Sequence, residues 1–341
     1  MKIIEVSGTP KELGRQTGEA LREEIHEHLG LYPPPRSEEW EQRLPAFLAT
    51  HRHAVPSIME EMDGLAEGAR VPREDIWGLN FPPYANSLNR DGCTNIVFSE
   101  SPDGPVWGKN NDGYEPGKQR PVCARVVRPH KGIPQINFTF CGMISVGDAL
   151  NEEGLAIGHS SVGSVFQQSD HFVAVRLWAY EALSRCRTTR EFVREMTSRP
   201  LRGKGYAWVA VDAEGDARSL EAACPLVQVR LPDLDEGIAC VNCYSLPQLA
   251  DADRRTPGGK ANAHRRRAFL DEAIPKHARH GITGMMELLR SHDAEAPICR
   301  HGDNDSEGSH TEYSMIGLPD QGRALVFHGY PCTGEYTEIA F

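Results

Sequence analysis

The ten residues "NRDGCTNIVF" at 89–98 decide how this chain is interpreted. The Asp-Gly pair is typical of a turn, and the apolar run that follows is typical of a buried strand. Cys93 therefore stands where a turn enters a strand. One interpretation is an ordinary loop before a strand. The second is that the Gly92–Cys93 bond breaks and Cys93 becomes the first residue of a new chain.

Cleavage would change the chemistry of Cys93, because its thiol would then share one residue with a free α-amine. An α-amine has a pKa of about 7.7–8.0, well below the value of about 10.4 for lysine. Such an amine can take the thiol proton, directly or through a water, so that one residue supplies both nucleophile and base. Gly92 suits this reaction, since glycine tolerates a strained backbone. On Asp-Gly-Cys-Thr alone, the structural interpretation is favoured.

Composition limits the possible functions. The chain has 341 residues, 39% hydrophobic and 25% charged, which is typical of a globular protein with a large core. Its 37 basic and 48 acidic residues give a net charge of −11, which argues against a nucleic-acid or membrane partner. We expect no export signal and no membrane span of about 20 apolar residues. The nine irregularly spaced cysteines indicate reduced thiols in a cytoplasmic protein.

The first 80 or so residues are predicted to be helical. "TPKE" at 9–12 has the pattern of a capping box with proline at the first helical position. Gly14 and Gly18 lie one turn apart and would allow another element to approach closely, at about 1 kcal/mol each relative to alanine. A further helix after Pro56 has one apolar face, formed by Ile58, Met62, Leu65, Ala66 and Ala69. Residues 85–92 are a candidate linker.

From Cys93 onward the pattern changes to short strands separated by turns. Helices are expected within 172–186, 188–198, 259–276 and 281–291, and strand-like segments end the chain. Runs of strands, then helices, then strands favour antiparallel sheets layered with helices, an α+β arrangement.

Five motifs occur in one order: "DGCTNIVF" at 91–98, "GKNND" at 108–112, "VGDALNEEGLAIGHSS" at 146–161, "ICRH" at 298–301 and "GYPC" at 329–332. Together with the helical segment "ELGRQTGEALREEI" they resemble the acyl-coenzyme A:isopenicillin-N acyltransferase-like family. These are penicillin acyltransferase-like N-terminal-nucleophile hydrolases, and the choloylglycine hydrolases are more distant relatives. Each motif is moderately specific, whereas the ordered set, which covers nearly the whole chain, is specific. The resemblance implies a four-layer αββα sandwich of antiparallel sheets with an N-terminal helical segment.

The resemblance also implies roles for four residues. Cys93 matches the nucleophile, and Asp112 matches the carboxylate that holds and orients the new α-amine through a charge-assisted hydrogen bond. Asn242 in "CVNCY" matches the asparagine that helps to stabilise the oxyanion. Asn151 in "ALNEEGL" matches a further asparagine of the catalytic site. Taken singly, each of these polar residues also fits an ordinary turn.

Substrate contacts are implied for a second group, which comprises Thr94, Lys109, Tyr114 and Ser314. The chain departs from the family pattern here. Some relatives carry an arginine near a C-terminal strand, whereas "SEGSHTEYSMIG" has none, so either Ser314 or His310 substitutes for it or its function is absent. The aromatic residue after the "N-x-D" aspartate is replaced by Gly113. Both departures fall where a substrate would contact the enzyme, so they bear on the identity of the substrate more than on the mechanism.

The cysteines also allow a zinc site. "CVNC" at 240–243, combined with Cys299 and His301, has Cys₃His composition. However, "IACVNCYSL" alternates like a strand and would direct its two thiols to different places. We therefore expect no metal ligands.

Three more interpretations are less favoured. A papain-like thiol enzyme would place its cysteine at a helix start, whereas Cys93 enters a strand. "DNDSEG" at 303–308 lacks the spacing of a calcium loop and fits an acidic surface loop. A binding protein on the same fold, without self-cleavage, would not need Cys93, Asp112 and Asn242 together.

The sequence thus predicts a self-processing cysteine amidohydrolase or acyltransferase that acts on small-molecule acyl amides or thioesters. Residues 1–92 would form the small chain and 93–341 the large chain, which stay associated as one compact unit. No cofactor is expected, although acyl-CoA fits as a co-substrate. Hydrolysis or transfer, the acyl group, the amine and homo-oligomerisation are left open.

Overall fold

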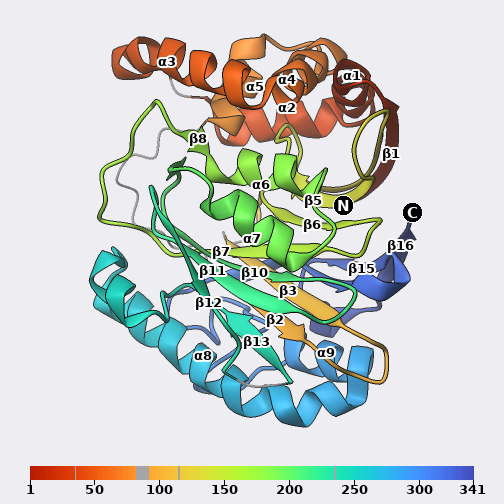
Figure 1. Cartoon of the computed structure of the whole chain (residues 1–341), viewed down its shortest axis with the longest axis vertical. Coiled ribbons are helices and arrows are strands. Elements are labelled where there is room, and N and C mark those ends of the chain that lie inside the picture. The colour runs from red at the N-terminus through yellow and green to blue at the C-terminus, as the bar shows by residue number, and fades with distance from the viewer. Residues whose placement is uncertain (35, 82–91, 114–115, 234–235) are drawn as a thin grey trace.

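Two β-sheets pack face to face between two layers of helices (Figure 1). This computed structural model describes residues 1–34, 36–81, 92–113, 116–233 and 236–341. The first helical layer covers the eight-stranded sheet, and the second covers the six-stranded sheet at the opposite end of the molecule. The predicted α+β class and four-layer αββα sandwich are confirmed.

The eight-stranded sheet consists, in spatial order, of β1 (Lys2–Gly8), β4 (Val122–Pro129), β5 (Gln135–Phe140), β6 (Asp148–Asn151), β7 (Ala156–Ser161), β10 (Tyr206–Val211), β11 (Ala217–Ala222) and β12 (Val227–Arg230). The six-stranded sheet consists of β13 (Gly237–Cys240), β2 (Cys93–Phe98), β3 (Val106–Gly113), β14 (His310–Leu318), β15 (Arg323–His328) and β16 (Thr337–Ala340). A short parallel pair, β8 (Val173–Ala174) and β9 (Leu201–Arg202), lies apart from both sheets.

The helices beside the eight-stranded sheet are α1 (Pro10–Ala20), α2 (Arg22–Leu31), α3 (Glu38–Ala54), α4 (Pro56–Ala69), α5 (Arg73–Asn80), α6 (Val175–Leu183) and α7 (Thr189–Thr197). On the other side lie α8 (Pro257–His277) and α9 (Gly281–Leu289). Four 3₁₀ turns also occur in the described chain, at Pro247–Ala252, Ala278–His280, Pro319–Gln321 and Pro331–Thr333. Among the helices described, none combines the length and apolar character needed to cross a membrane.

The first residues differ from the helical expectation, because Lys2–Gly8 form strand β1. This strand pairs in parallel with β4, so the eight-stranded sheet is not wholly antiparallel. The segment "KIIEVSG" is rich in β-branched residues, which suit a sheet, and Val6 is buried with Leu13 and Val127. The N-terminal segment thus contributes a strand to the large sheet as well as helices above it.

The start of α1 forms as predicted. The Thr9 hydroxyl accepts a hydrogen bond from the Glu12 N–H, and the Glu12 carboxylate accepts one from the Thr9 N–H at 2.8 Å. This reciprocal capping box satisfies two backbone donors that an isolated helix end leaves open.

The predicted close approach at the α1 glycines is also confirmed. Four glycines line the contact between α1 and α4: Gly14, Gly18, Gly64 and Gly68. A Cβ on Gly14 would lie 1.9 Å from the carbonyl oxygen of Glu61, and one on Gly64 would lie 2.1 Å from that of Lys11. The two helices therefore touch backbone to backbone, which no residue with a side chain permits.

A buried ion pair joins α4 to the sheet. Glu61 on α4 pairs with Arg125 on β4, and both side chains are buried. The Tyr180 hydroxyl donates to Glu61 at 3.2 Å, and Arg125 donates to the carbonyl of Ile144 at 3.0 Å. Breaking a buried pair typically costs about 3–5 kcal/mol, so this contact strongly favours one position of the helical layer.

Replacing Gly14 with alanine should destabilise the protein, because the added Cβ would overlap the Glu61 carbonyl oxygen. We expect a loss of about 1–3 kcal/mol in the free energy of unfolding, measured by urea titration. Gly30, near the end of α2, is the matched control, because a Cβ there meets nothing within 4 Å. Gly30→Ala should be neutral or stabilising by up to about 1 kcal/mol. Equal effects of the two substitutions would contradict the close packing.

Candidate active site

Cys93 is the first residue of β2, a strand in which every residue is buried. Residues alternate between the two faces of a strand. Val97 therefore packs between the sheets, whereas Ile96 and Phe98 pack beneath α8 and α9. Cys93 lies on the same face as Val97 and opposite Asn111 of β3, and its thiol donates to the Asn111 side-chain oxygen at 3.5 Å. The thiol is thus held at the start of an interior strand, toward the interface of the sheets.

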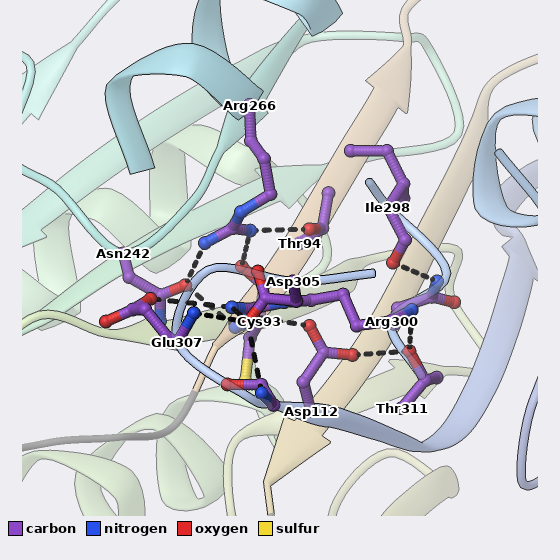
Figure 2. Close-up of polar contacts among 12 residues, drawn as sticks. Cys93, Thr94, Asp112, Asn242, Arg266, Ile298, Arg300, Asp305, Glu307 and Thr311 are labelled. Carbon is purple, nitrogen blue, oxygen red and sulfur yellow. Dashed lines mark hydrogen bonds and ion pairs between the residues drawn. The ribbon is translucent and has the colours of Figure 1, made fainter. Parts of the chain in front are cut away.

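The side chain of Asn242, which follows β13, is directed at the backbone of Cys93. Its Oδ1 accepts the Cys93 N–H at 2.8 Å (Figure 2). Its Nδ2 donates to the Ser161 carbonyl at 2.7 Å. Donors surround its oxygen and an acceptor faces its nitrogen, so the orientation of the amide follows from its partners. In this chain Asn242 orients the Cys93 nitrogen, whereas the resemblance implied that it donates to an oxyanion.

Arg266 of α8 reaches the start of β2 from the other side. Its Nη1 donates to the Cys93 carbonyl at 3.1 Å and to the Thr94 hydroxyl at 2.9 Å, and its Nη2 donates to Asn242 Oδ1 at 2.8 Å (Figure 2). Its Nε donates to Asn262, one turn earlier on α8, at 2.9 Å. One guanidinium group therefore fixes both the nucleophile strand and the asparagine that holds the Cys93 nitrogen.

Arg300 lies against the residue that precedes Cys93. A Cβ on Gly92 would lie 1.4 Å from its Nη1, so only glycine fits beside this guanidinium group. Arg300 also pairs with Asp112 at 3.4 Å, and the second oxygen of Asp112 accepts the Thr311 hydroxyl at 2.8 Å (Figure 2). The Gly92–Cys93 peptide bond is thus flanked by a buried cation and its carboxylate.

The segment "DNDSEG" contributes ligands for this arginine. Arg300 Nη2 lies 2.5 Å from Asp305 and 3.4 Å from Glu307. Glu307 also binds Arg255 at 2.8 Å, and Arg255 donates to the carbonyl of Asn242 at 2.7 Å. Asp305 is buried and Glu307 is partly buried, whereas Asp303, Ser306 and Gly308 are exposed, so the predicted acidic surface loop also turns two carboxylates toward Arg300.

The burial of these charges changes their pKa values. Burial raises the pKa of Asp112 to about 6, although Arg300 and Arg266 oppose the shift. Burial, together with the nearby positive charge of Arg300, lowers the pKa of Arg266 to about 10. Both effects arise because water is excluded from a site that concentrates charge.

The structure brings together five of the residues proposed from the sequence, namely Gly92, Cys93, Thr94, Asp112 and Asn242. Thr94 contacts Arg266 through its hydroxyl and is fully buried. Tyr114 lies outside the residues that the structure describes.

Lys109 is on the same strand as Asp112 but has different partners. Its Nζ is 2.6 Å from Asp148 and donates to the His159 carbonyl at 2.7 Å, and its side chain is fully buried. Asp148 also accepts from the His159 ring at 2.9 Å. Burial opposes the ionisation of Asp148, but Lys109 and His159 hold its pKa below the usual value. These contacts tie Lys109 to the opposite sheet.

Asn151 and Ser314 also have structural partners. Asn151 donates to the carbonyls of Leu183 and Cys186 at 2.9 and 2.8 Å, which ties the end of β6 to the connection between α6 and α7. The Ser314 hydroxyl donates to the Lys109 carbonyl at 3.2 Å. Neither residue has a contact with Cys93 among those described, and the roles implied by the resemblance stay predictions.

The sequence did not indicate that Arg266 and Arg300 are site residues. Arg300 lies within the quoted motif at 298–301 and supplies a cation where "SEGSHTEYSMIG" has none. Arg266 had a detectable signal, because Asn262, Arg266 and Leu270 are spaced by four residues along the buried face of α8. A charged residue on the buried face of a helix indicates an internal partner, whereas one on the solvent side does not.

The likeness of this chain to known proteins is distant. The sequence matches no protein-family model and no curated protein. Among solved structures, an N-acylethanolamine-hydrolyzing acid amidase ortholog from Caenorhabditis elegans is 13% identical, covers 67% of this chain and 93% of its own, and has a TM-score of 0.49. A mutant of conjugated bile acid hydrolase from Clostridium perfringens is 13% identical, covers 73% and 97%, and has a TM-score of 0.46. Penicillin V acylase from Agrobacterium tumefaciens is 15% identical, covers 69% and 83%, and has a TM-score of 0.44. At these values the similarity supports no statement about family or activity.

Replacing Lys109 with methionine should leave Asp148 as a buried carboxylate without its main cation. We expect a loss of about 3–5 kcal/mol in the free energy of unfolding at neutral pH, measured by urea titration. Lys131→Met is the control, because Lys131 is exposed, and it should change stability by less than about 0.5 kcal/mol. If Lys109→Met were as stable as the control, the ion pair would not be structural.

Proposed function

We propose that this protein is a self-processing cysteine amidohydrolase or acyltransferase of the N-terminal-nucleophile type. The observation that carries the proposal is the environment of the Gly92–Cys93 bond. The Cys93 nitrogen is held by Asn242 at 2.8 Å, and the space beside Gly92 is occupied by Arg300. An ordinary loop cysteine would not need buried groups aimed at both sides of its peptide bond.

In the processing step, the Cys93 thiol attacks the Gly92 carbonyl. The Gly92–Cys93 C–N bond breaks as the C–S bond forms, and the thiol proton passes to the nitrogen that becomes the α-amine. Water then hydrolyses the thioester, which releases the Gly92 carboxylate and returns the thiol. The reaction consumes one water and needs no cofactor.

Arg300 and Arg266 suit this step electrostatically. Negative charge develops on the attacked carbonyl oxygen, and a cation held in place before the reaction stabilises that charge without reorganisation. Arg300 lies against Gly92, whose carbonyl is attacked, and Arg266 holds the Cys93 carbonyl at 3.1 Å. We assign Arg300 the larger role, because it lies on the side of the attacked carbonyl.

After cleavage, the same contacts would hold the new amine. Asn242 Oδ1 already accepts from the Cys93 nitrogen, and Asp112 follows Asn111, the register partner of Cys93. A buried carboxylate near an amine favours its ordered orientation through a charge-assisted bond. The α-amine can then take the thiol proton as the thiol attacks a substrate amide and return it to the leaving amine.

The acyl group would pass through a Cys93 thioester in the working enzyme. Attack breaks the substrate C–N bond, releases the amine and leaves the acyl group on sulfur. Water then gives hydrolysis, whereas a second amine gives transfer, and acyl-CoA could load the same thioester. The substrate class is therefore a small acyl amide or thioester, with bile-salt, penicillin-type, β-alanyl-amine and acyl-amino-acid amides all compatible.

Contacts between residues 1–92 and residues 93–341 support the proposal that the small and large chains stay associated. Strand β1 belongs to the same sheet as β4, and the buried Glu61–Arg125 pair joins the two segments. His28 also lies 2.6 Å from the Cys141 carbonyl. The nine cysteines are all free thiols, which fits the proposed cytoplasmic location.

Intact-mass spectrometry under denaturing conditions tests self-processing. We expect two fragments that separate between Gly92 and Cys93 in the wild type and one full-length chain in Cys93→Ala, because the substitution removes the nucleophile. Cys186→Ala, which removes a buried thiol of the helix-side core, should cleave like the wild type. A single full-length wild-type chain, under all conditions in which the protein is folded, would refute the proposal.

The substrate step is then tested on the processed protein. Short incubation with each amide class should add the acyl mass to the Cys93 fragment, and added amines should divert the product from acid to amide if transfer occurs. Absence of an acyl adduct and of product across all classes would leave self-cleavage without the proposed enzyme activity.

Self-cleavage should slow as the pH falls below about 6, because protonation of Asp112 removes one of the three negative charges that hold Arg300 beside Gly92. Asp112→Asn should cleave at least about 10²-fold more slowly and lack this acid limb. The cleavage rate is measured by gel densitometry, in a reaction that is started by refolding a denatured precursor or by removing an inhibitor from it.

The effect of Asp112 on stability has the opposite pH dependence, so slower cleavage in acid can be distinguished from acid unfolding. The pKa of Asp112 is raised on folding, so its contribution to stability is present at low pH and is lost as the pH rises through about 6. Acid therefore does not unfold the protein through this group. Circular dichroism should show native structure across the acid limb, and an identical limb in Asp112→Asn would contradict the assignment.

A further inference from the structure

We propose that His292, Cys299, His301 and Cys332 form a tetrahedral site for a transition-metal ion, with zinc as the ion that best fits the ligands. Each residue offers one ligand atom, and the four atoms lie within 4.8 Å of one another. The site lies outside the catalytic contacts described above and does not depend on the activity proposed for Cys93.

The three distances among Cys299, His301 and Cys332 match edges of a zinc tetrahedron, and the ligand atom of His292 lies within 4.8 Å of the other three. The two sulfurs are 3.7 Å apart, and His301 Nε2 lies 3.4 Å from the Cys299 sulfur and 3.3 Å from the Cys332 sulfur. With Zn–S about 2.3 Å and Zn–N about 2.0–2.1 Å, tetrahedral geometry gives about 3.8 Å between sulfurs and about 3.5 Å between sulfur and nitrogen. A disulfide would instead require about 2.05 Å between the sulfurs.

The fold assembles these ligands from three places in the chain. His292 follows α9, Cys299 and His301 lie in the segment before β14, and Cys332 lies in the 3₁₀ turn after β15. Cys299 and His301 flank Arg300, whose side chain turns to the opposite side and enters the active site. The partners of Arg300, Asp112 and Asp305, are therefore distinct from the side chains that meet at the proposed metal site.

Backbone contacts hold the ligand segment in place. The Cys299 N–H donates to the Ser291 carbonyl at 2.9 Å, and the His301 N–H donates to Asn304 Oδ1 at 2.8 Å. Asn304 in turn donates to the Cys299 carbonyl at 3.0 Å. Such supporting contacts orient metal ligands and strengthen metal binding.

Aromatic neighbours orient the imidazole rings. The Tyr330 ring stacks on His301 with centroids 4.0 Å apart, and its hydroxyl lies 2.8 Å from His310 Nδ1. The His292 ring meets His301 edge-on, at an interplanar angle of 86°. Two thiols with two imidazoles are ligands that suit zinc, whereas calcium and magnesium prefer oxygen.

This set revises the metal expectation drawn from the sequence. Cys299 and His301 take part, but "CVNC" does not, because Cys240 contacts the Ala207 carbonyl at 3.4 Å and Cys243 packs in the core beneath α8. The divergence of those two thiols was predicted. The partners that replace them, His292 and Cys332, come together only through the fold.

Metal binding should stiffen the backbone on both sides of Arg300. If the proposed function holds, removal of the ion would therefore slow self-cleavage as well as lower thermal stability. Metal affinity can be measured independently of self-cleavage, because Cys93→Ala, which cannot cleave, should bind the ion as the wild type does.

The test uses the reduced full-length chain, stripped with EDTA and titrated with Co²⁺ and then Zn²⁺. We expect one Zn²⁺ per chain by elemental analysis, and in the Co²⁺ form the intense visible bands and thiolate charge-transfer absorption of a tetrahedral site. Cys332→Ser and His292→Ala should each weaken binding at least about 100-fold. The matched controls Cys186→Ala and His264→Ala remove a core thiol and an exposed imidazole and should bind normally.

Two results would overturn the proposal. One is the absence of Co²⁺ and Zn²⁺ binding while all the thiols remain reduced. The second is a Cys299–Cys332 disulfide in the freshly purified protein that excludes metal, found by non-reducing peptide mapping. If Cys332→Ser does not fold, His292→Ala decides, because His292 is exposed and its loss leaves the core intact.

Discussion

The buried guanidinium group of Arg300 is the constraint on which the centre of this structure depends. A charge removed from water must be paired, and Arg300 is fully buried among three carboxylates, those of Asp112, Asp305 and Glu307. These carboxylates come from β3 and from the loop before β14, so satisfying one cation fixes a strand and a loop against each other. The same side chain fills the space beside Gly92, which leaves no room there for any other residue. Packing and charge compensation therefore converge on the peptide bond before Cys93.

The two sheets give this constraint its rigidity. β2 lies between β13 and β3 in the six-stranded sheet and is buried on both faces, with the second sheet on one side and α8 and α9 on the other. Arg266 crosses from α8 to the start of β2, and Lys109 crosses from β3 to the second sheet. These two contacts connect the pair of strands β2 and β3 to the helical layer on one side and to the eight-stranded sheet on the other. A reacting bond held in this way loses little entropy on reaching a productive geometry.

Much of the architecture was predictable because its causes are local. The capping box at Thr9, the glycine spacing at Gly14 and the alternation of the strands act within a few residues of one another, and the structure confirms them. Strand β1 was missed, because its pairing partner β4 lies more than a hundred residues away. Candidate site residues that a motif placed correctly along the chain, such as Asn151, nevertheless make structural contacts elsewhere. A motif gives the position of a residue along the chain, whereas the residues that it contacts are set by the packing of the fold.

The sequence by itself determined the α+β class, the position of Cys93 at the start of a buried strand, and the glycines that allow α1 and α4 to touch. Periodicity, capping and turn chemistry set these features, and they require no knowledge of distant neighbours. Only the tertiary structure decided that Arg266 and Arg300 enter the site, and that Cys332 meets Cys299 from 33 positions along the chain. The physical reason is that a charged or metal-binding side chain has many partners of suitable chemistry along the chain, and the fold selects among them by bringing only a few within contact.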